Sequence, residues 1–144
     1  MRAIKFRGQR EDTEKWVYGS LIEDKYIVGN VIDWNEDYFN TEYWWTVIPE
    51  TVGQFTGLHD KNGKEIYEGD IVSAYKDLTE MYSRGSVENG TLEVWEEVVG
   101  NIDIPKEIVE YIGSSFRIGE YYLDTIEDCE LEVIGNIHDN KEIK

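Results

Sequence analysis

The chain has 144 residues, enough for one compact domain or a small domain with an extra lobe, and its 40% apolar content predicts a folded protein. It has 14 Lys and Arg against 31 Asp and Glu, a formal net charge of −17 that repels nucleic acid phosphates and anionic lipid. Cys129 is the only cysteine, which excludes an intrachain disulfide, and no apolar run suits a signal peptide or a membrane span, so we expect a cytoplasmic protein.

The first third of the chain predicts strands separated by turns. Residues 3–8 and 15–22 are rich in β-formers and flank a charged segment, which predicts a hairpin. Residues 25–34 predict a further strand, bent or bulged at Gly29. Pro49 ends the following segment because its nitrogen cannot donate a hydrogen bond to a neighbouring strand.

Aromatic residues are concentrated between Trp34 and Trp45, where they occupy six of the twelve positions. Flat rings of this kind stack on bases, sugars or the side chains of a partner. Packing in the core or in an oligomer interface explains most of the run more simply, since large aromatic residues are usually buried. The candidate partner surface comprises Trp34, Tyr38, Tyr43, Trp44 and Trp45.

The middle of the chain predicts two strands, residues 51–58 and 64–75, joined by a tight turn. Asn62 and Gly63 form its tip, since both residues tolerate positive φ. The residues that we assign to turns are Gly57, Asp60, Asn62, Gly63, Gly69 and Asp70. A calcium loop is a poor alternative, because counting from Asp60 puts Gly63 at the fourth position instead of the sixth. We expect Asp70 to accept hydrogen bonds from turn amides.

The last part of the chain predicts more short strands. Residues 76–86 give a weak pattern that suits one helical turn or a loop. Residues 91–99 alternate, residues 106–123 read as two strands that turn at 113–115, and residues 130–140 form the last strand. A helix over residues 104–113 is the rival interpretation, with Pro105 in its first turn. Many short strands favour an all-β barrel or sandwich.

Basic side chains gather near the start of the chain, at Arg2, Lys5, Arg7 and Arg10. In a strand, Lys5 and Arg7 point to one face and Arg2 to the other, so these residues do not form a single positive stripe. We expect them to pair with the acidic body of the protein, and direct binding of nucleic acid is disfavoured.

Carboxylates are abundant enough to suggest a metal-dependent enzyme that acts on nucleic acid or nucleotide. Its metal ligands would come from the region Asp60–Asp70 and from a set comprising Glu65, Glu68, Asp70, Asp124 and Asp128. A solvated acidic face is the more economical explanation in so acidic a chain. A site built on His59 and His138 requires the two turns to meet in space. No nucleotide-binding, hydrolase or zinc-protease motif is present, so we assign no catalytic, cofactor-binding or metal-binding residue.

Three segments resemble the YopX proteins, small cytoplasmic proteins encoded by bacteriophages and prophages: IKFRG at 4–8, QFTGLHDKNGKEIYEGDIV at 54–72 and ELEVIGNIHDN at 130–140. The resemblance implies a mostly β protein with an N-terminal β lobe, residues 1–55, an SH3-like β-barrel, residues 56–144, and at most one or two short helices. It implies no known reaction, cofactor or catalytic residue. Gly8, Gln9 and Lys141 depart from the family pattern.

The sequence therefore favours a non-enzymatic phage or prophage accessory protein that binds a host or phage protein and self-associates. In a sharper version its carboxylates mimic nucleic acid phosphates on a basic partner. The carboxylates assigned to this role are Glu88, Glu93, Glu96, Glu97, Glu110, Glu120, Asp124, Glu127 and Asp128. Acidity that serves only solubility is the simpler alternative. The metal-dependent enzyme is the competing function.

Overall fold

The chain folds into antiparallel β-sheets in the computed structural model, which describes residues 4–126 and 129–139. Two 3-10 helices of three residues each, η1 (Pro49–Thr51) and η2 (Leu123–Thr125), are the helical elements of the described residues. This confirms the predicted mostly β class with at most two short helices. In the same residues, no helix has the length and apolar character needed to cross a membrane.

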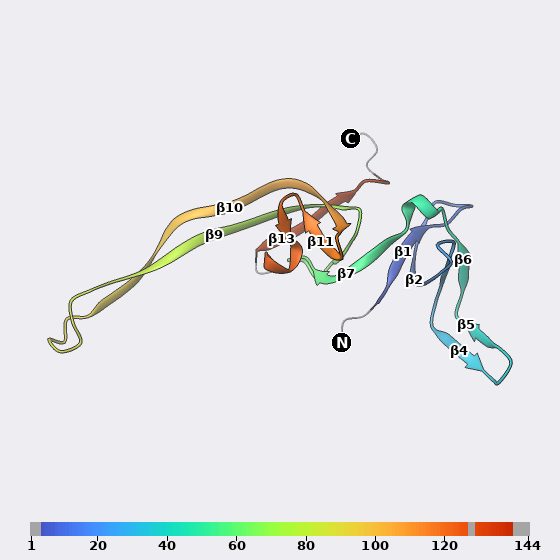
Figure 1. Cartoon of the computed structure of the whole chain (residues 1–144), viewed down its shortest axis with the longest axis horizontal. Helices are drawn as coiled ribbons and strands as arrows, with labels where there is room; N and C mark the ends of the chain where they lie inside the picture. Colours follow the sequence, from blue (N-terminus) through green and yellow to red (C-terminus); the bar gives the residue numbers. More distant parts are fainter. Residues whose placement is uncertain (1–3, 127–128, 140–144) are drawn as a thin grey trace.

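The N-terminal part forms a six-stranded sheet in the order β6-β3-β2-β1-β7-β8. Its strands are β1 (Phe6–Gln9), β2 (Trp16–Ile22), β3 (Tyr26–Val28), β6 (Trp44–Thr46), β7 (Gly53–His59) and β8 (Glu65–Tyr67). The predicted first hairpin is present, with Phe6 paired to Gly19 and Gln9 to Trp16. A separate hairpin of β4 (Val31–Trp34) and β5 (Phe39–Thr41) extends from this sheet (Figure 1). The predicted lobe boundary at residues 55/56 falls within β7, which pairs with both β1 and β8.

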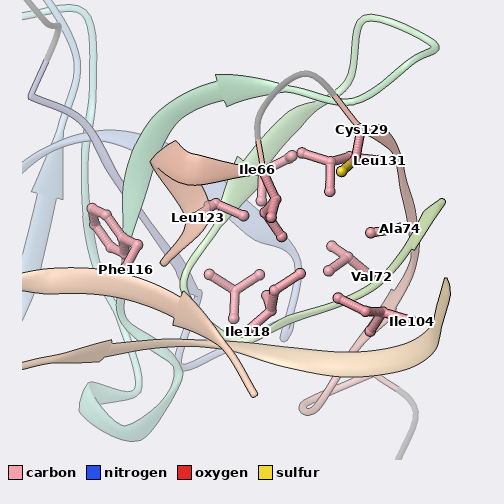
Figure 2. Close-up of a cluster of buried hydrophobic side chains, with 11 residues drawn as sticks. Ile66, Val72, Ala74, Ile104, Phe116, Ile118, Leu123, Cys129 and Leu131 are labelled. Carbon is pink, nitrogen blue, oxygen red and sulfur yellow. The ribbon is translucent and has the colours of Figure 1, made fainter. Parts of the chain in front are cut away.

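The C-terminal part forms a five-stranded sheet in the order β12-β11-β10-β9-β13. Its strands are β9 (Asp70–Arg84), β10 (Glu93–Ile112), β11 (Ser115–Ile118), β12 (Tyr121–Tyr122) and β13 (Glu130–Asn136). Buried side chains from β8, β9, β10, β11, β13 and the η2 region form the main core (Figure 2). Val72, Val109 and Ile118 are fully buried in it. No sheet of the described residues closes on itself, so the predicted SH3-like barrel is not confirmed.

A long two-stranded arm projects from this core (Figure 1). Strands β9 and β10 pair with each other along their outer halves, whereas β13 follows β9 only as far as Tyr75 and β11 follows β10 only from Val109 to Ile112. We call the ribbon between Lys76 and Asp103 the arm.

Strands β9 and β10 correct two predictions. Residues 76–84 belong to β9, and residues 85–86 lie at the turn that follows it. Both alternatives, a helical turn and a loop, are therefore wrong for residues 76–84. Residues 104–112 belong to β10, so the rival helix is also wrong. Pro105 sits where the pairing register slips between Ile104 and Glu107, a position in a strand that tolerates the missing N–H.

Candidate partner-binding surfaces

The Asp60 carboxylate organises the turn between β7 and β8. Its Oδ1 accepts hydrogen bonds from the backbone amides of Asn62 and Lys64, both at 2.9 Å, and its Oδ2 accepts one from Val133 at 3.0 Å. Burial raises the pKa of Asp60, but the three amides outweigh it and hold the pKa below its ordinary value. Gly63 adopts a φ of +84°, which this turn requires. Asp60 therefore ties the turn to β13.

Asp70 is the first residue of β9 and directly follows the second turn, in which Gly69 has a positive φ. Gly57, which the sequence predicts in a turn, also has a positive φ but lies within β7. The Oδ2 atom of Asp70 accepts a hydrogen bond from the Tyr67 amide at 2.7 Å, and its Oδ1 lies 2.8 Å from Nη2 of Arg7. Burial raises the pKa of Asp70, against the opposing effects of the Arg7 guanidinium and the Tyr67 amide. Both oxygens already have partners within the protein.

Arg7 is held between two aromatic rings as well as by Asp70. Its guanidinium carbon lies 4.5 Å from the ring centroid of Trp16 and 4.9 Å from that of Tyr67. The indole of Trp16 in turn donates a hydrogen bond of 2.8 Å to the carboxylate of Asp139. This cluster joins β1 and β2 to the turn before β9 and to the end of the chain, and it acts as a structural joint.

The carboxylates of the metal-enzyme hypothesis are spread over separate contacts. Glu65 pairs with Lys5 at 2.6 Å and accepts a hydrogen bond from the Tyr67 hydroxyl at 2.9 Å. The rings of His59 and His138 pack on Phe55 and Trp16 respectively. Within residues 4–126 and 129–139, no three His, Cys, Asp or Glu side chains converge as metal ligands. The side chain of Asp124 and the whole of Asp128 lie outside the described residues.

The aromatic candidates differ in accessibility. Trp34 and Trp44 are 72% and 62% exposed, and Tyr38 is also exposed. Tyr43 donates its hydroxyl to the backbone oxygen of Tyr18 at 2.6 Å. Trp45 lies beneath the Arg10 guanidinium, whose carbon is 3.6 Å from the ring centroid. A hollow of about 590 Å³ is lined by Glu11, Asp12, Trp44, Trp45 and Thr46.

The arm is a further surface. The predicted strand at residues 91–99 corresponds to the outer half of β10, whereas the outer half of β9 and the pairing of the two strands were missed. Strand pairing places Ser83 opposite Val94, Met81 opposite Glu96 and Thr79 opposite Val98 on one face. We call Met81, Val94 and Val98 the apolar face; their side chains are 65%, 57% and 62% exposed. A row of glutamates in residues 88–97 was the sequence signal, but it indicated acidity rather than a ribbon.

The opposite face of the arm carries aromatic and acidic side chains. Tyr82 lies opposite Trp95 with ring centroids 6.0 Å apart and nearly parallel planes. The Tyr82 hydroxyl donates to Glu80 at 3.0 Å, and the Trp95 indole donates to Glu97 at 2.9 Å. Glu80 and Glu97 are themselves direct cross-strand partners. Two like charges opposite each other destabilise a ribbon, so this face is suited to a cation.

Comparisons with known proteins identify a family and a structural neighbour. The family model described as YopX protein matches residues 5–143. The chain belongs to the YopX family. Protein EF1440 from Enterococcus faecalis, solved as a crystal structure, is similar to this YopX chain with a TM-score of 0.56 and 21% sequence identity over 99% of each chain. At that identity the likeness shows the fold alone. No curated protein matches this chain.

The acidic residues singled out in this YopX protein fall in several places. Glu93, Glu96 and Glu97 lie on β10 in the arm, and Glu88 lies in the turn at its tip. The remaining described positions are Glu110 on β10, Glu120 in the turn after β11 and Asp124 in η2. Glu127 and Asp128 lie outside the described residues, as does Arg2 of the basic group.

Proposed function

We propose that this YopX-family protein is a non-enzymatic protein-binding module of a phage or prophage, and that its arm is the binding element. The protein acts in the cytoplasm of the bacterial host and contacts a host or phage protein. The observation that carries this proposal is the arm itself, a two-stranded ribbon with exposed apolar side chains on both faces and no covering layer in the described residues.

An uncovered two-stranded ribbon of this length is poorly stabilised in water, since such ribbons normally need a third strand or a packed layer. Met81, Val94 and Val98 lie exposed on one face of it, with Glu96 opposite Met81 and between the two valines. Covering each of these side chains contributes about 1 kcal/mol to an interface. A partner that packs on the arm therefore gains affinity and orders the ribbon.

The test is affinity capture from phage-infected cells with the full chain, followed by titration of each captured protein in purified form. The variant Met81→Ser/Val98→Ser removes the apolar face. We expect it to weaken the binding of the purified partner at least tenfold. Val87→Ser is the matched control, because Val87 is exposed in the turn at the tip of the arm and lies outside the apolar face. Equal affinity of the two variants would refute the arm as binding element.

Self-association is a second candidate function, favoured by the β4–β5 hairpin. Every residue of β4 is exposed, including Ile32 and Trp34, and Phe39 on β5 is exposed as well. Sedimentation equilibrium of the wild type and of Trp34→Ser/Phe39→Ser tests it. We expect an oligomer that the hairpin variant dissociates and that Met81→Ser leaves intact. A wild-type monomer at about 100 μM would remove this candidate.

Acidic mimicry of nucleic acid is the sharper form of the primary proposal. Glu93 and Glu97 lie on one face of β10 and Glu96 lies on the other, so basic side chains of a DNA-binding protein would contact them from both sides of the arm. Such an interface is strongly screened by salt. We expect the affinity for the identified partner to fall at least tenfold between about 50 and 200 mM salt. Indifference to salt would exclude mimicry while leaving the apolar face as a binding surface.

A further inference from the structure

We infer that the outer edge of β10 between Glu93 and Val98 is a strand-addition site for an extended segment of a partner protein, in which Lys or Arg alternates with apolar residues. This rests on the proposed function, because it takes the arm as the binding element. It goes further by naming the edge that pairs and the side-chain pattern that is recognised.

The outer edge of β10 is open at this point. Its inner edge pairs with β9 from Glu93 opposite Arg84 to Val98 opposite Thr79, whereas β11 joins the outer edge only at Val109–Ile112. Along Glu93–Val98 no strand of the described chain occupies the outer side. In an antiparallel ribbon every second residue directs its N–H and C=O groups away from the partner strand. These groups can pair with an added strand.

The usable edge is short and regular. The register slips between Val98 and Gly100, so the uninterrupted stretch at the tip ends at Val98. A shallow hollow lies over the adjoining face of the ribbon, lined by Arg84 of β9 and by Glu93, Val94, Trp95 and Glu97 of β10. An added segment of about six residues fits this stretch, because each residue advances about 3.4 Å along a strand.

The two side-chain rows of this edge have different chemistry. Glu93, Trp95 and Glu97 lie on one face, and Val94, Glu96 and Val98 lie on the other. A strand added to the edge places its own side chains alternately beside these two rows. Within the chain Glu93 already pairs with Arg84 at 2.7 Å, the Arg84 guanidinium carbon lies 5.8 Å from the Trp95 ring centroid, and Glu97 accepts a hydrogen bond from the Trp95 indole. An incoming Lys or Arg therefore competes with Arg84 at Glu93 and adds charge and cation–π contact at Trp95 and Glu97. The two valines suit an apolar side chain.

Charge also decides against a second copy of this chain at the edge. The arm holds two basic and seven acidic residues between Lys76 and Asp103, and the whole chain carries a net charge of −17. Pairing two such arms would set carboxylates beside carboxylates, which destabilises the pairing. Edge charges of this kind commonly prevent unwanted strand pairing. Here they repel an acidic strand and attract a basic one.

The test uses fluorescein-labelled nine-residue peptides and the full chain, with fluorescence anisotropy as the readout. One peptide alternates Lys with Val. A second has the same composition with all Lys at one end, and a third is the alternating peptide with every second backbone nitrogen methylated. We expect the alternating peptide to bind at least tenfold more tightly than either control. Equal binding of the three would overturn the inference, since attraction between opposite charges alone requires neither alternation nor backbone pairing.

Charge-neutral variants locate the site. Glu93→Gln/Glu97→Gln should weaken binding of the alternating peptide about tenfold, and Glu88→Gln/Glu110→Gln is the matched control with the same change in net charge. Hydrogen exchange should show protection of β10 amides at residues 93–98 when the peptide is bound. Protection elsewhere, or equal losses in the two double variants, would overturn the edge site. The two proposals can also be separated. If Met81→Ser/Val98→Ser loses its natural partner but the alternating peptide does not bind the wild type, the proposed function is retained and only the strand-addition site is refuted.

Discussion

Arg7 and Asp70 form a buried ion pair, with Nη2 of Arg7 2.8 Å from Oδ1 of Asp70 and side-chain exposures of 6% and 1%. The pair joins the first strand of the chain to the first residue of the strand that continues into the arm. The two residues belong to different sheets, so their contact is one of the links that fix the position of those sheets relative to each other.

Removing one member of this pair should destabilise the protein strongly. In Asp70→Ala the guanidinium of Arg7 stays buried without its carboxylate, which costs about 3 to 5 kcal/mol of unfolding free energy. Urea unfolding followed by tryptophan fluorescence measures the loss. The control is Arg84→Gln, which breaks the exposed pair of Arg84 with Glu93 and should cost less than about 1 kcal/mol. Similar losses in the two variants would contradict a structural role for the buried pair.

Asp60 should make stability depend on pH in the acid range. Its folded-state pKa lies below the ordinary value of 3.8, so the unfolded chain binds more protons as the pH falls. Its stabilising contribution is complete above the unfolded pKa and disappears as the pH drops through the folded pKa. Asp60→Asn should therefore be less stable than the wild type at about pH 6, and the difference should shrink near pH 3. A difference that stays constant with pH would count against this assignment.

Alanine substitutions at two glycines should lower the stability of the protein by different amounts. Gly63 has a φ of +84° with open space around its Cβ position, so Gly63→Ala costs only the backbone strain, about 1 kcal/mol. At Gly53 a Cβ would lie 2.5 Å from the backbone oxygen of Glu68. Gly53→Ala should therefore cost about 2 to 3 kcal/mol, because β7 and the turn after β8 that contains Glu68 must move apart. Thermal unfolding of the two variants should rank them in this order, and the reverse order would refute the packing argument.

The competing metal-dependent enzyme makes a separate prediction. The lone pairs of Asp60 and Asp70 are engaged by backbone amides and by Arg7, so we expect no rise in melting temperature with magnesium, manganese, zinc or calcium. Thermal-shift measurements with each ion test this directly. A rise of several degrees that Asp60→Asn abolishes would revive the enzyme hypothesis, and a rise that persists in this variant would place the metal elsewhere.

Sequence patterns predicted the local parts of the fold. The first hairpin and the turn at Asn62 and Gly63 depend on residues close together in the chain, so their signals lie within a few positions. The expected pairing of the basic N-terminal residues was also visible in composition, although the partners were not. Lys5 pairs with Glu65 and Arg7 with Asp70, both far along the chain. Partners so distant cannot be chosen from a single sequence with 31 carboxylates.

The first strand of the arm was missed for a physical reason. Alternation predicts a strand when one face is buried, and between residues 76 and 84 neither face of β9 is covered. Apolar residues such as Leu78 and Met81 therefore fall on opposite faces beside charged ones. The strand forms because it pairs with β10 across the turn at the tip. At Pro105 the sequence allowed a helix where the structure has a strand. Proline suits the first turn of a helix, but it also fits an irregularity in a strand.

Val99 determines which side chains of β10 face the core and which lie on the opposite side of the ribbon. Along β10 the apolar residues Val94, Val98, Ile102 and Ile104 all have even numbers, with Glu96 and Gly100 between them, and strict alternation would put them on one face. The extra residue in the ladder at Val99 reverses the parity, so Ile102 and Ile104 turn toward the core while Val94 and Val98 turn to the other side of the ribbon. The one extra residue thus separates the core side chains Ile102 and Ile104 from the exposed side chains Val94 and Val98. If Val99 took a regular place in the ladder, Val94 and Val98 would instead lie on the same face of the ribbon as Ile102 and Ile104.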